Sequence, residues 1–160
     1  MSSPQGTSSR DVATVERLIP APPEAIFDLL ADPARHQDID GSGTVRAAMA
    51  GAERLRLGSV FGMNMKMGFG YTMQNTVVEF VDNRRIAWQA RPTNKVVGML
   101  VGGRIWRYEL EPVEGGTLVR ESWDISQEQV KFSVRSLRAR TLLAMAKTLQ
   151  QIERLVTSQP

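Results

Sequence analysis

The sequence contains no cysteine, which excludes disulfide bonds and thiolate-ligated metal sites. His36 is its only histidine, so a metal site built from several imidazoles is excluded as well. No segment approaches the ~18 consecutive apolar residues that a membrane-spanning helix needs. Residues 1–10 are rich in serine and lack the apolar stretch of a signal peptide. Together these features predict a cytoplasmic protein without a metal, a cofactor or a membrane span, although the absence of cysteine also permits export.

Positive charge is present but is not concentrated. The chain has 20 Lys and Arg against 17 Asp and Glu, scattered apart from Arg135, Arg138 and Arg140. A nucleic-acid-binding surface gathers its basic residues on one face, so we expect no nucleic acid as a partner. With 160 residues, 42% of them hydrophobic, the chain can bury one sizeable core. We therefore expect a disordered tail over residues 1–10 and a single domain over 11–157.

Residues 104–125 carry the clearest local pattern, which is that of a β-hairpin. Trp106 and Tyr108 share the parity of Leu110, while charged residues occupy the alternate positions. Because side chains alternate between the faces of a strand, one face is predicted to be aromatic and buried and the other solvated. The Gly115-Gly116 pair supplies the positive φ angles that a tight turn needs.

The second strand of this hairpin places a carboxylate on an apolar face. Glu121 has the same parity as Val119 and Trp123. A buried carboxylate is costly in free energy unless it is paired or hydrated. Glu121 therefore either forms an ion pair with an arginine such as Arg104, or lies in a pocket where it orients a ligand hydroxyl or acts as a general base.

The rest of the chain predicts an ordered series of elements. A strand at 12–19 is followed by a helix over 24–31, and Asp32-Pro33 opens a second short helix. A helix over 133–156 ends the chain, and its apolar residues form one stripe wide enough to cover a core. The other strands are predicted at 44–49, 58–67, 70–82, 84–91, 104–113 and 116–125. This order predicts an α+β fold in which one long helix covers an antiparallel sheet.

The apolar stripe of the last helix, extended backwards, includes Arg135 and Arg138. Either the helix projects beyond the core at that end, or these arginines guard an opening. Long basic side chains reach water easily, which favours the first interpretation.

Several segments between residues 11 and 156 share the pattern of one known superfamily. They are Val15-Glu16-Arg17, Pro22-Pro23-Glu24-Ala25-Ile26-Phe27, Ala31-Asp32-Pro33-Ala34-Arg35-His36, Asp40-Gly41-Ser42-Gly43, Asn75-Thr76-Val77-Val78-Glu79-Phe80, Ile86-Ala87-Trp88, Trp106-Arg107-Tyr108-Glu109-Leu110-Glu111-Pro112 and Gly115-Gly116-Thr117. In them the chain resembles the START-like (SRPBCC) superfamily, in its polyketide cyclase/dehydrase-like branch of actinobacterial type. The resemblance implies a helix-grip fold, with a curved antiparallel sheet of six to seven strands wrapped on a long C-terminal helix and two short helices after the first strand. It carries over no catalytic residue.

The resemblance also implies a small hydrophobic or amphipathic ligand, such as a lipid, a polyketide or an aromatic metabolite. We expect its site in a cavity of several hundred Å³ between the sheet and the last helix. Aromatic rings would form rigid walls and methionines an adaptable one, although core packing also explains the methionines at 58–73. The candidate ligand-binding residues are Met63, Met65, Trp88, Met99, Trp106, Tyr108, Glu121, Trp123, Leu142, Met145 and Leu149.

Two rival functions stay open. A polyketide cyclase/dehydratase-type enzyme would use Glu121, His36 or Tyr108 to move a proton, although a structural role at a helix end is favoured for His36. An interaction domain would leave no cavity at all. The glycine-rich segment 92–103 is interpreted as a lid over the cavity mouth, or as a strand edge or dimer contact. The protein is accordingly expected to be a monomer or a homodimer.

Overall fold

The computed structural model describes residues 10–42, 45–48, 53–67, 69–99 and 101–158. Its main feature is a seven-stranded antiparallel sheet in the order β1-β7-β6-β5-β4-β3-β2. All seven predicted strands are present, with ends within a few residues of those expected. They are β1 (Val12–Ile19), β2 (Val45–Ala48), β3 (Val60–Met67), β4 (Phe69–Val81), β5 (Arg85–Pro92), β6 (Ile105–Val113) and β7 (Gly116–Asp124).

Short helices follow the first strand, as predicted. The helix α1 (Pro23–Leu30) begins at a proline, whose fixed φ and missing N–H suit a first helical turn. The side chain of Asp32 accepts a hydrogen bond from the amide of Ala34 at 3.0 Å and caps a 3₁₀ turn. The further helical elements are η1 (Pro33–Arg35), α2 (His36–Ile39), α3 (Lys95–Gly98), α4 (Lys131–Arg135) and α5 (Arg138–Thr157). In the described part of the chain, no helix combines the length and hydrophobicity required to cross a membrane.

The β6–β7 hairpin has the predicted alternation. Trp106 pairs with Trp123, Tyr108 with Glu121 and Leu110 with Val119 across the two strands. Gly115 and Gly116 turn the chain with φ angles of 90° and 149°. The aromatic side chains and Glu121 therefore lie on one face of the sheet.

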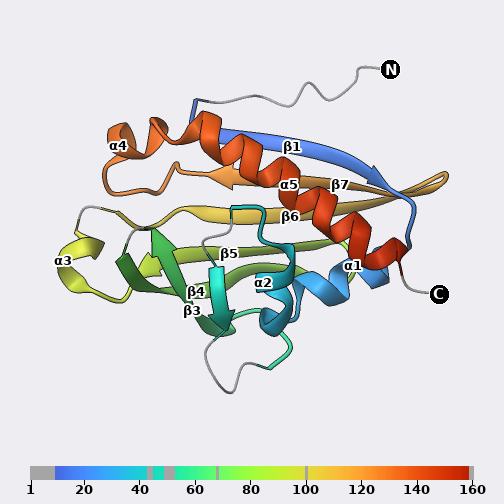
Figure 1. The fold of residues 1–160 in the computed structure, drawn as a ribbon, viewed down its shortest axis with the longest axis horizontal. Helices are drawn as coiled ribbons and strands as arrows, with labels where there is room; N and C mark the ends of the chain where they lie inside the picture. The colour runs from blue at the N-terminus through green and yellow to red at the C-terminus, as the bar shows by residue number, and fades with distance from the viewer. Residues whose placement is uncertain (1–9, 43–44, 49–52, 68, 100, 159–160) are drawn as a thin grey trace.

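The C-terminal helix crosses that face diagonally (Figure 1). Leu149 and Ile152 of α5 are buried against α1 and the sheet, in a cluster that includes Phe27, Ile86 and Val119. A second cluster lies toward the start of α5 and contains Trp123, Ile125, Val134 and Met145. The helix-grip arrangement expected from the sequence is confirmed.

The prediction of one continuous helix from 133 to 156 is wrong. The chain forms α4, breaks at Ser136 and Leu137, and continues as α5. Val134 of α4 is buried beside Trp123 and Ile125 at one end of the sheet. The break lets the chain bury Val134 there and then change direction to cross the sheet.

Neither interpretation of Arg135 and Arg138 holds, because the neighbouring Val134 is buried in the core and both arginines contact residues just before β1. The guanidinium of Arg135 contacts the carboxylate of Asp11 at 2.7 Å, and that of Arg138 donates to the carbonyl oxygen of Arg10 at 3.3 Å. These two arginines therefore attach the start of β1 to the C-terminal helices.

A glycine allows α5 to approach the chain that follows α2. The amide of Gly41 donates to the hydroxyl of Thr148 at 2.9 Å. A Cβ atom at position 41 would overlap the backbone of α5 at Ala144 and Thr148. This close approach holds the residues after α2 against the helix that covers the sheet.

Candidate functional site

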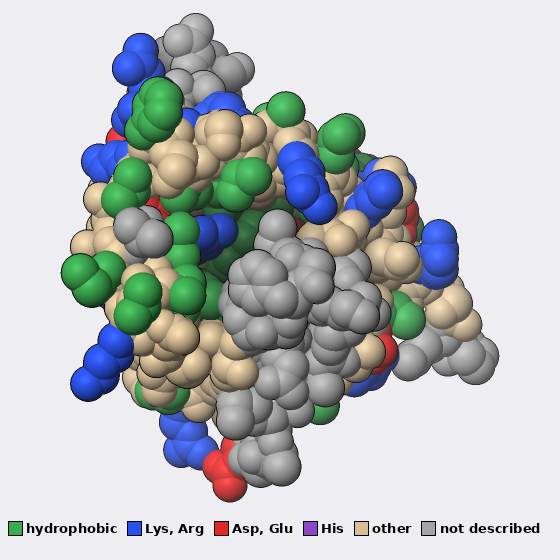
Figure 2. Space-filling model, turned by 60° about the vertical axis from the view of Figure 1, so that its left-hand side comes forward, with side chains coloured by type: hydrophobic (Ala, Val, Ile, Leu, Met, Phe, Trp, Pro, Cys, Tyr) green, Lys and Arg blue, Asp and Glu red, His purple; other side chains and the backbone are tan. Residues whose placement is uncertain are grey.

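A cavity of about 420 Å³ lies between the concave face of the sheet and α5. Its volume agrees with the several hundred Å³ predicted from the sequence. Figure 2 shows the face on which it opens, with hydrophobic side chains around the hollow and a basic side chain inside it. Strands β4 to β7, the residues of α2 and its following loop, and one face of α5 supply the walls.

Stacked aromatic rings form much of the sheet side of this cavity. The ring centroid of Trp88 is 5.7 Å from that of Tyr108 and 4.9 Å from that of His36, with an angle of 22° between the Trp88 and His36 planes. Phe61 contacts both Trp88 and His36 edge-on. Trp106 lies on the next strand, in register with Trp88. The rings restrain one another and present a rigid apolar surface.

His36 is a neutral member of this wall. Its Nε2 donates to the carbonyl oxygen of Leu30 at 2.8 Å, which fixes the tautomer. Burial lowers the pKa of the imidazole to about 4. The ring is therefore uncharged at neutral pH. It packs against Phe61 and Trp88, and its hydrogen bond to Leu30 connects α2 to α1.

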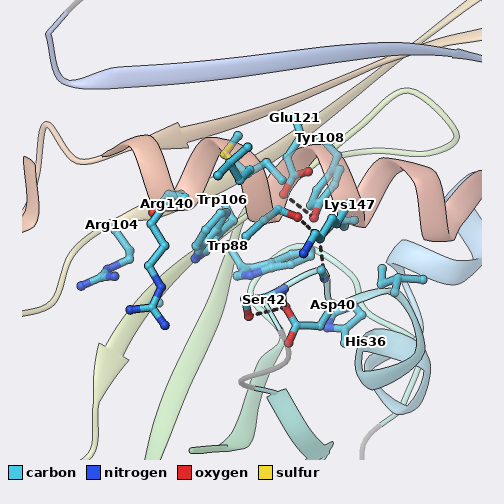
Figure 3. A pocket seen from close by; sticks show the side chains of 18 of the residues that line it. His36, Asp40, Ser42, Trp88, Arg104, Trp106, Tyr108, Glu121, Arg140 and Lys147 are labelled. Atoms are coloured by element: carbon cyan, nitrogen blue, oxygen red, sulfur yellow. Dashed lines mark hydrogen bonds between the residues drawn. The ribbon is translucent and has the colours of Figure 1, made fainter. Parts of the chain in front are cut away.

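Glu121 and Tyr108 form a buried polar pair at the back of the cavity (Figure 3). The Tyr108 hydroxyl donates to Glu121 Oε1 at 2.8 Å, and Glu121 is only 2% exposed. Burial raises the pKa of Glu121 to about 8, against the lowering effect of the Tyr108 hydrogen bond, and Asp40 adds a smaller increase. Burial also raises the pKa of Tyr108 well above its usual value. At neutral pH the pair is thus a carboxylic acid and a phenol, both uncharged.

The interpretation that Glu121 forms an ion pair with Arg104 is wrong. Arg104 Nε instead donates to Oε1 of Glu128 at 2.7 Å, and the other oxygen of Glu128 accepts from the amide of Gly102. This arrangement leaves Glu121 without a cationic partner among the described residues. Its Oε2 atom is buried and has no hydrogen-bond partner there.

Basic side chains line the outer part of the cavity. Arg104 and Arg140 lie at one end in Figure 3, while Lys147 points inward from α5. Arg140 and Lys147 form no ion pair with any residue that the structure describes. Asp40 is the acidic group on the opposite side, where it accepts from the amide and the hydroxyl of Ser42 at 3.0 and 2.6 Å. Within the described ranges no cluster of His, Asp and Glu could hold a metal ion.

The sequence profile of the family described as "Polyketide cyclase / dehydrase and lipid transport" matches residues 10–157. The chain belongs to this family. Its match spans the whole sheet, α5 and the cavity between them.

Curated relatives of this family member are found in Mycobacterium tuberculosis. The uncharacterized protein Rv0088 of strain H37Rv is 33% identical over 108 residues, and MT0096 of strain CDC 1551 is 32% identical over 108 residues. Each alignment covers 66% of this chain and 44% of the relative. The chain therefore spans less than half the length of these relatives.

Solved structures share the fold over nearly the whole chain. Protein CV1439 from Chromobacterium violaceum has a TM-score of 0.72 at 19% identity, covering 92% of this chain and 98% of that one. Ms6760 from Mycobacterium smegmatis has a TM-score of 0.71 at 14% identity, with 93% and 92% covered. An AHSA1-like protein from Aeromonas hydrophila reaches 0.65 at 17% identity, with 92% of each chain covered. At these identities the likeness is one of fold.

The structure brings together part of the set of candidate ligand-binding residues. Trp88, Trp106, Tyr108, Glu121 and Met145 line the cavity, as does His36. The remaining candidates with described side chains do not line it: Trp123 and Leu149 are buried in the two clusters, Leu142 packs against the second of them, and Met99 is 74% exposed beside α3. The side chains of Met63 and Met65 lie outside the described part.

Asn75 is the most informative wall residue that the sequence reading missed. It lies on β4, is 5% exposed and lines the cavity, and its side chain makes no hydrogen bond to a described residue. Asn75 could have been found from the sequence, because it alternates with Met73 and Val77 along β4 and is therefore a polar residue on an apolar strand face. Glu121 has the same kind of position on β7. The lining residues Arg140 and Lys147 gave no such signal, since exposed basic residues on a helix are ordinary.

Proposed function

We propose that this protein binds a small hydrophobic or amphipathic molecule in the cavity between the sheet and α5. The observation that carries the proposal is the 420 Å³ cavity itself, walled by Trp88, Trp106, Tyr108 and Met145. Ligand sites are typically concave, mostly apolar and provided with few polar groups, as this one is. Membership of a family whose description includes lipid transport supports the same function.

The charge around the opening favours an amphipathic ligand over a purely apolar one. Arg140 and Lys147 have no acidic partner among the described residues, whereas Arg104 is neutralised by Glu128. An anionic group on the ligand would lie near these unpaired cations while the apolar body fills the cavity. Exposed ion pairs contribute about 0.2–1 kcal/mol, so this contact would tune affinity while burial dominates it.

Two matched dyes test the proposal and its charge preference. N-phenyl-1-naphthylamine is neutral, and 8-anilino-1-naphthalenesulfonate has the same rings with a sulfonate. Both should bind the folded protein with an increase in fluorescence. Arg140→Ala should weaken the sulfonate dye about two- to fivefold, by loss of one exposed ion pair, and leave the neutral dye unchanged.

Arg154→Ala is the matched control, because Arg154 is exposed on α5 and does not line the cavity. This variant should leave both dyes unaffected. Absence of neutral-dye binding to the folded protein would contradict the binding function. Equal effects of Arg140→Ala and Arg154→Ala would contradict the preference for an anionic group.

A cyclase/dehydratase-type enzyme is a second candidate, favoured by the protonated acid at Glu121. A carboxylic acid with a pKa of about 8 can give a proton to a substrate oxygen at neutral pH and take one back. Turnover of a poly-β-keto substrate that is lost in Glu121→Gln, with binding retained, would support the enzyme. A chain that binds such substrates without converting them is a carrier.

A further inference from the structure

The hydrogen-bonding state of Glu121 constrains the chemistry of the ligand. Its Oε1 accepts from the Tyr108 hydroxyl at 2.8 Å, while its Oε2 is buried and unpartnered among the described residues. The ionisable groups that act on the pKa of Glu121 are Tyr108 on β6 and Asp40 after α2, and neither supplies a positive charge. Of the remaining charged residues of the cavity, Arg104 is paired with Glu128 and His36 is neutral. Arg140 and Lys147 line the outer part of the cavity, are exposed to solvent and form no ion pair with Glu121.

The position of the proton on this acid follows from these contacts. With no cation paired to it, burial keeps the carboxyl group protonated at neutral pH. Because Oε1 already receives the hydrogen of the Tyr108 hydroxyl, the acid proton is on Oε2. Glu121 therefore places an O–H donor, which has no acceptor among the described residues, in the aromatic wall of the cavity.

We infer that the bound ligand carries a carbonyl oxygen that accepts a hydrogen bond from Oε2–H of Glu121. This inference rests on the proposed binding function and specifies its ligand class: a ketone, ester or amide carbonyl within a largely apolar body. A buried donor left without an acceptor is costly, so a ligand that supplies one is favoured. A carbonyl does so without a donor of its own, whereas a ligand hydroxyl or amine would bring a further hydrogen that also needs a partner.

The preference for a carbonyl has a defined dependence on pH. When Glu121 loses its proton, at pH values above about 8, Oε2 changes from a donor to a charged acceptor and repels a carbonyl oxygen. Glutamine at this position would keep the geometry, because its carbonyl can accept from Tyr108 while its NH₂ group donates at the position of Oε2. Glutamine does not ionise, so it should retain the preference at every pH.

The test uses 2-acetylnaphthalene and 2-ethylnaphthalene, which differ by one carbonyl group, as competitors of bound N-phenyl-1-naphthylamine. At pH 6.5 the wild type should bind the ketone about three- to tenfold more tightly than the hydrocarbon, as expected for one hydrogen bond to a buried donor. At pH 9.5 this ratio should fall to about one. Glu121→Gln should keep the ratio at both pH values, and Glu121→Leu should abolish it at both.

The outcomes separate this inference from the proposed function. Tight binding of both competitors at a ratio near one, unchanged by pH and by Glu121→Gln, overturns the carbonyl preference and leaves the binding function intact. Failure of both competitors and of the dye to bind the folded protein overturns both. If Glu121→Leu does not fold, as judged by its circular dichroism, the ketone-to-hydrocarbon affinity ratio of the wild type and of Glu121→Gln at the two pH values tests the carbonyl preference.

Discussion

Trp123→Ala is expected to lower the free energy of unfolding by about 3–5 kcal/mol, the range for truncating a large buried aromatic residue. Trp123 is 2% exposed and packs with Ala13, Ile125, Val134 and Met145. Its indole Nε1 has no hydrogen-bond partner among the described residues, so the loss would come from packing alone. Urea unfolding curves recorded by circular dichroism measure this loss of free energy of unfolding.

Trp106→Ala is the matched comparison, because Trp106 is the cross-strand partner of Trp123. Trp106 is only partly buried and faces the cavity, so its truncation should reduce stability by about 1–2 kcal/mol. Equal losses in the two variants would mean that the Trp106 ring is packed on all sides, and would contradict the cavity at that position.

Ala144→Phe is expected to weaken binding of N-phenyl-1-naphthylamine at least about tenfold, which corresponds to 1.4 kcal/mol. Ala144 lies on the face of α5 that lines the cavity, so a phenyl group there would occupy space needed by the ligand. The effect should appear in the dissociation constant from a fluorescence titration, with the helix content unchanged by circular dichroism.

The same substitution at Ala139 provides the control for that experiment. Ala139 is exposed on α5 and does not line the cavity, so Ala139→Phe should bind the dye as the wild type does. Equal weakening by Ala139→Phe and Ala144→Phe would show that the dye binds elsewhere on α5.

Much of the fold could be predicted because local signals were strong. Alternation in residues 104–125 identified the face of β6 and β7 that carries Trp106, Tyr108 and Glu121, and Gly115-Gly116 located the turn. The prolines after β1 identified the start of α1. These features depend on residues that are neighbours in the sequence, where periodicity and turn chemistry act directly.

The parts that could not be predicted depend on contacts between distant residues. The partner of Arg104 is Glu128, 24 positions away, and nothing local distinguishes this choice from Glu121. The break at Ser136 and Leu137 follows from the burial of Val134 beside β7, which only the assembled sheet creates. Parity identified the strand faces, but it could not separate Trp106, which lines the cavity, from Trp123, which is packed in a core cluster.

The three tryptophan indole groups allow the most direct test of a ligand in the cavity. ¹H–¹⁵N NMR spectra recorded during a titration with N-phenyl-1-naphthylamine, with signals assigned by single Trp→Phe variants, report on each ring separately. Binding in the cavity predicts large shifts for Trp88 and Trp106, which line it, and the smallest shift for Trp123, which does not. Unchanged Trp88 and Trp106 signals at saturating dye would contradict a ligand site between the sheet and α5.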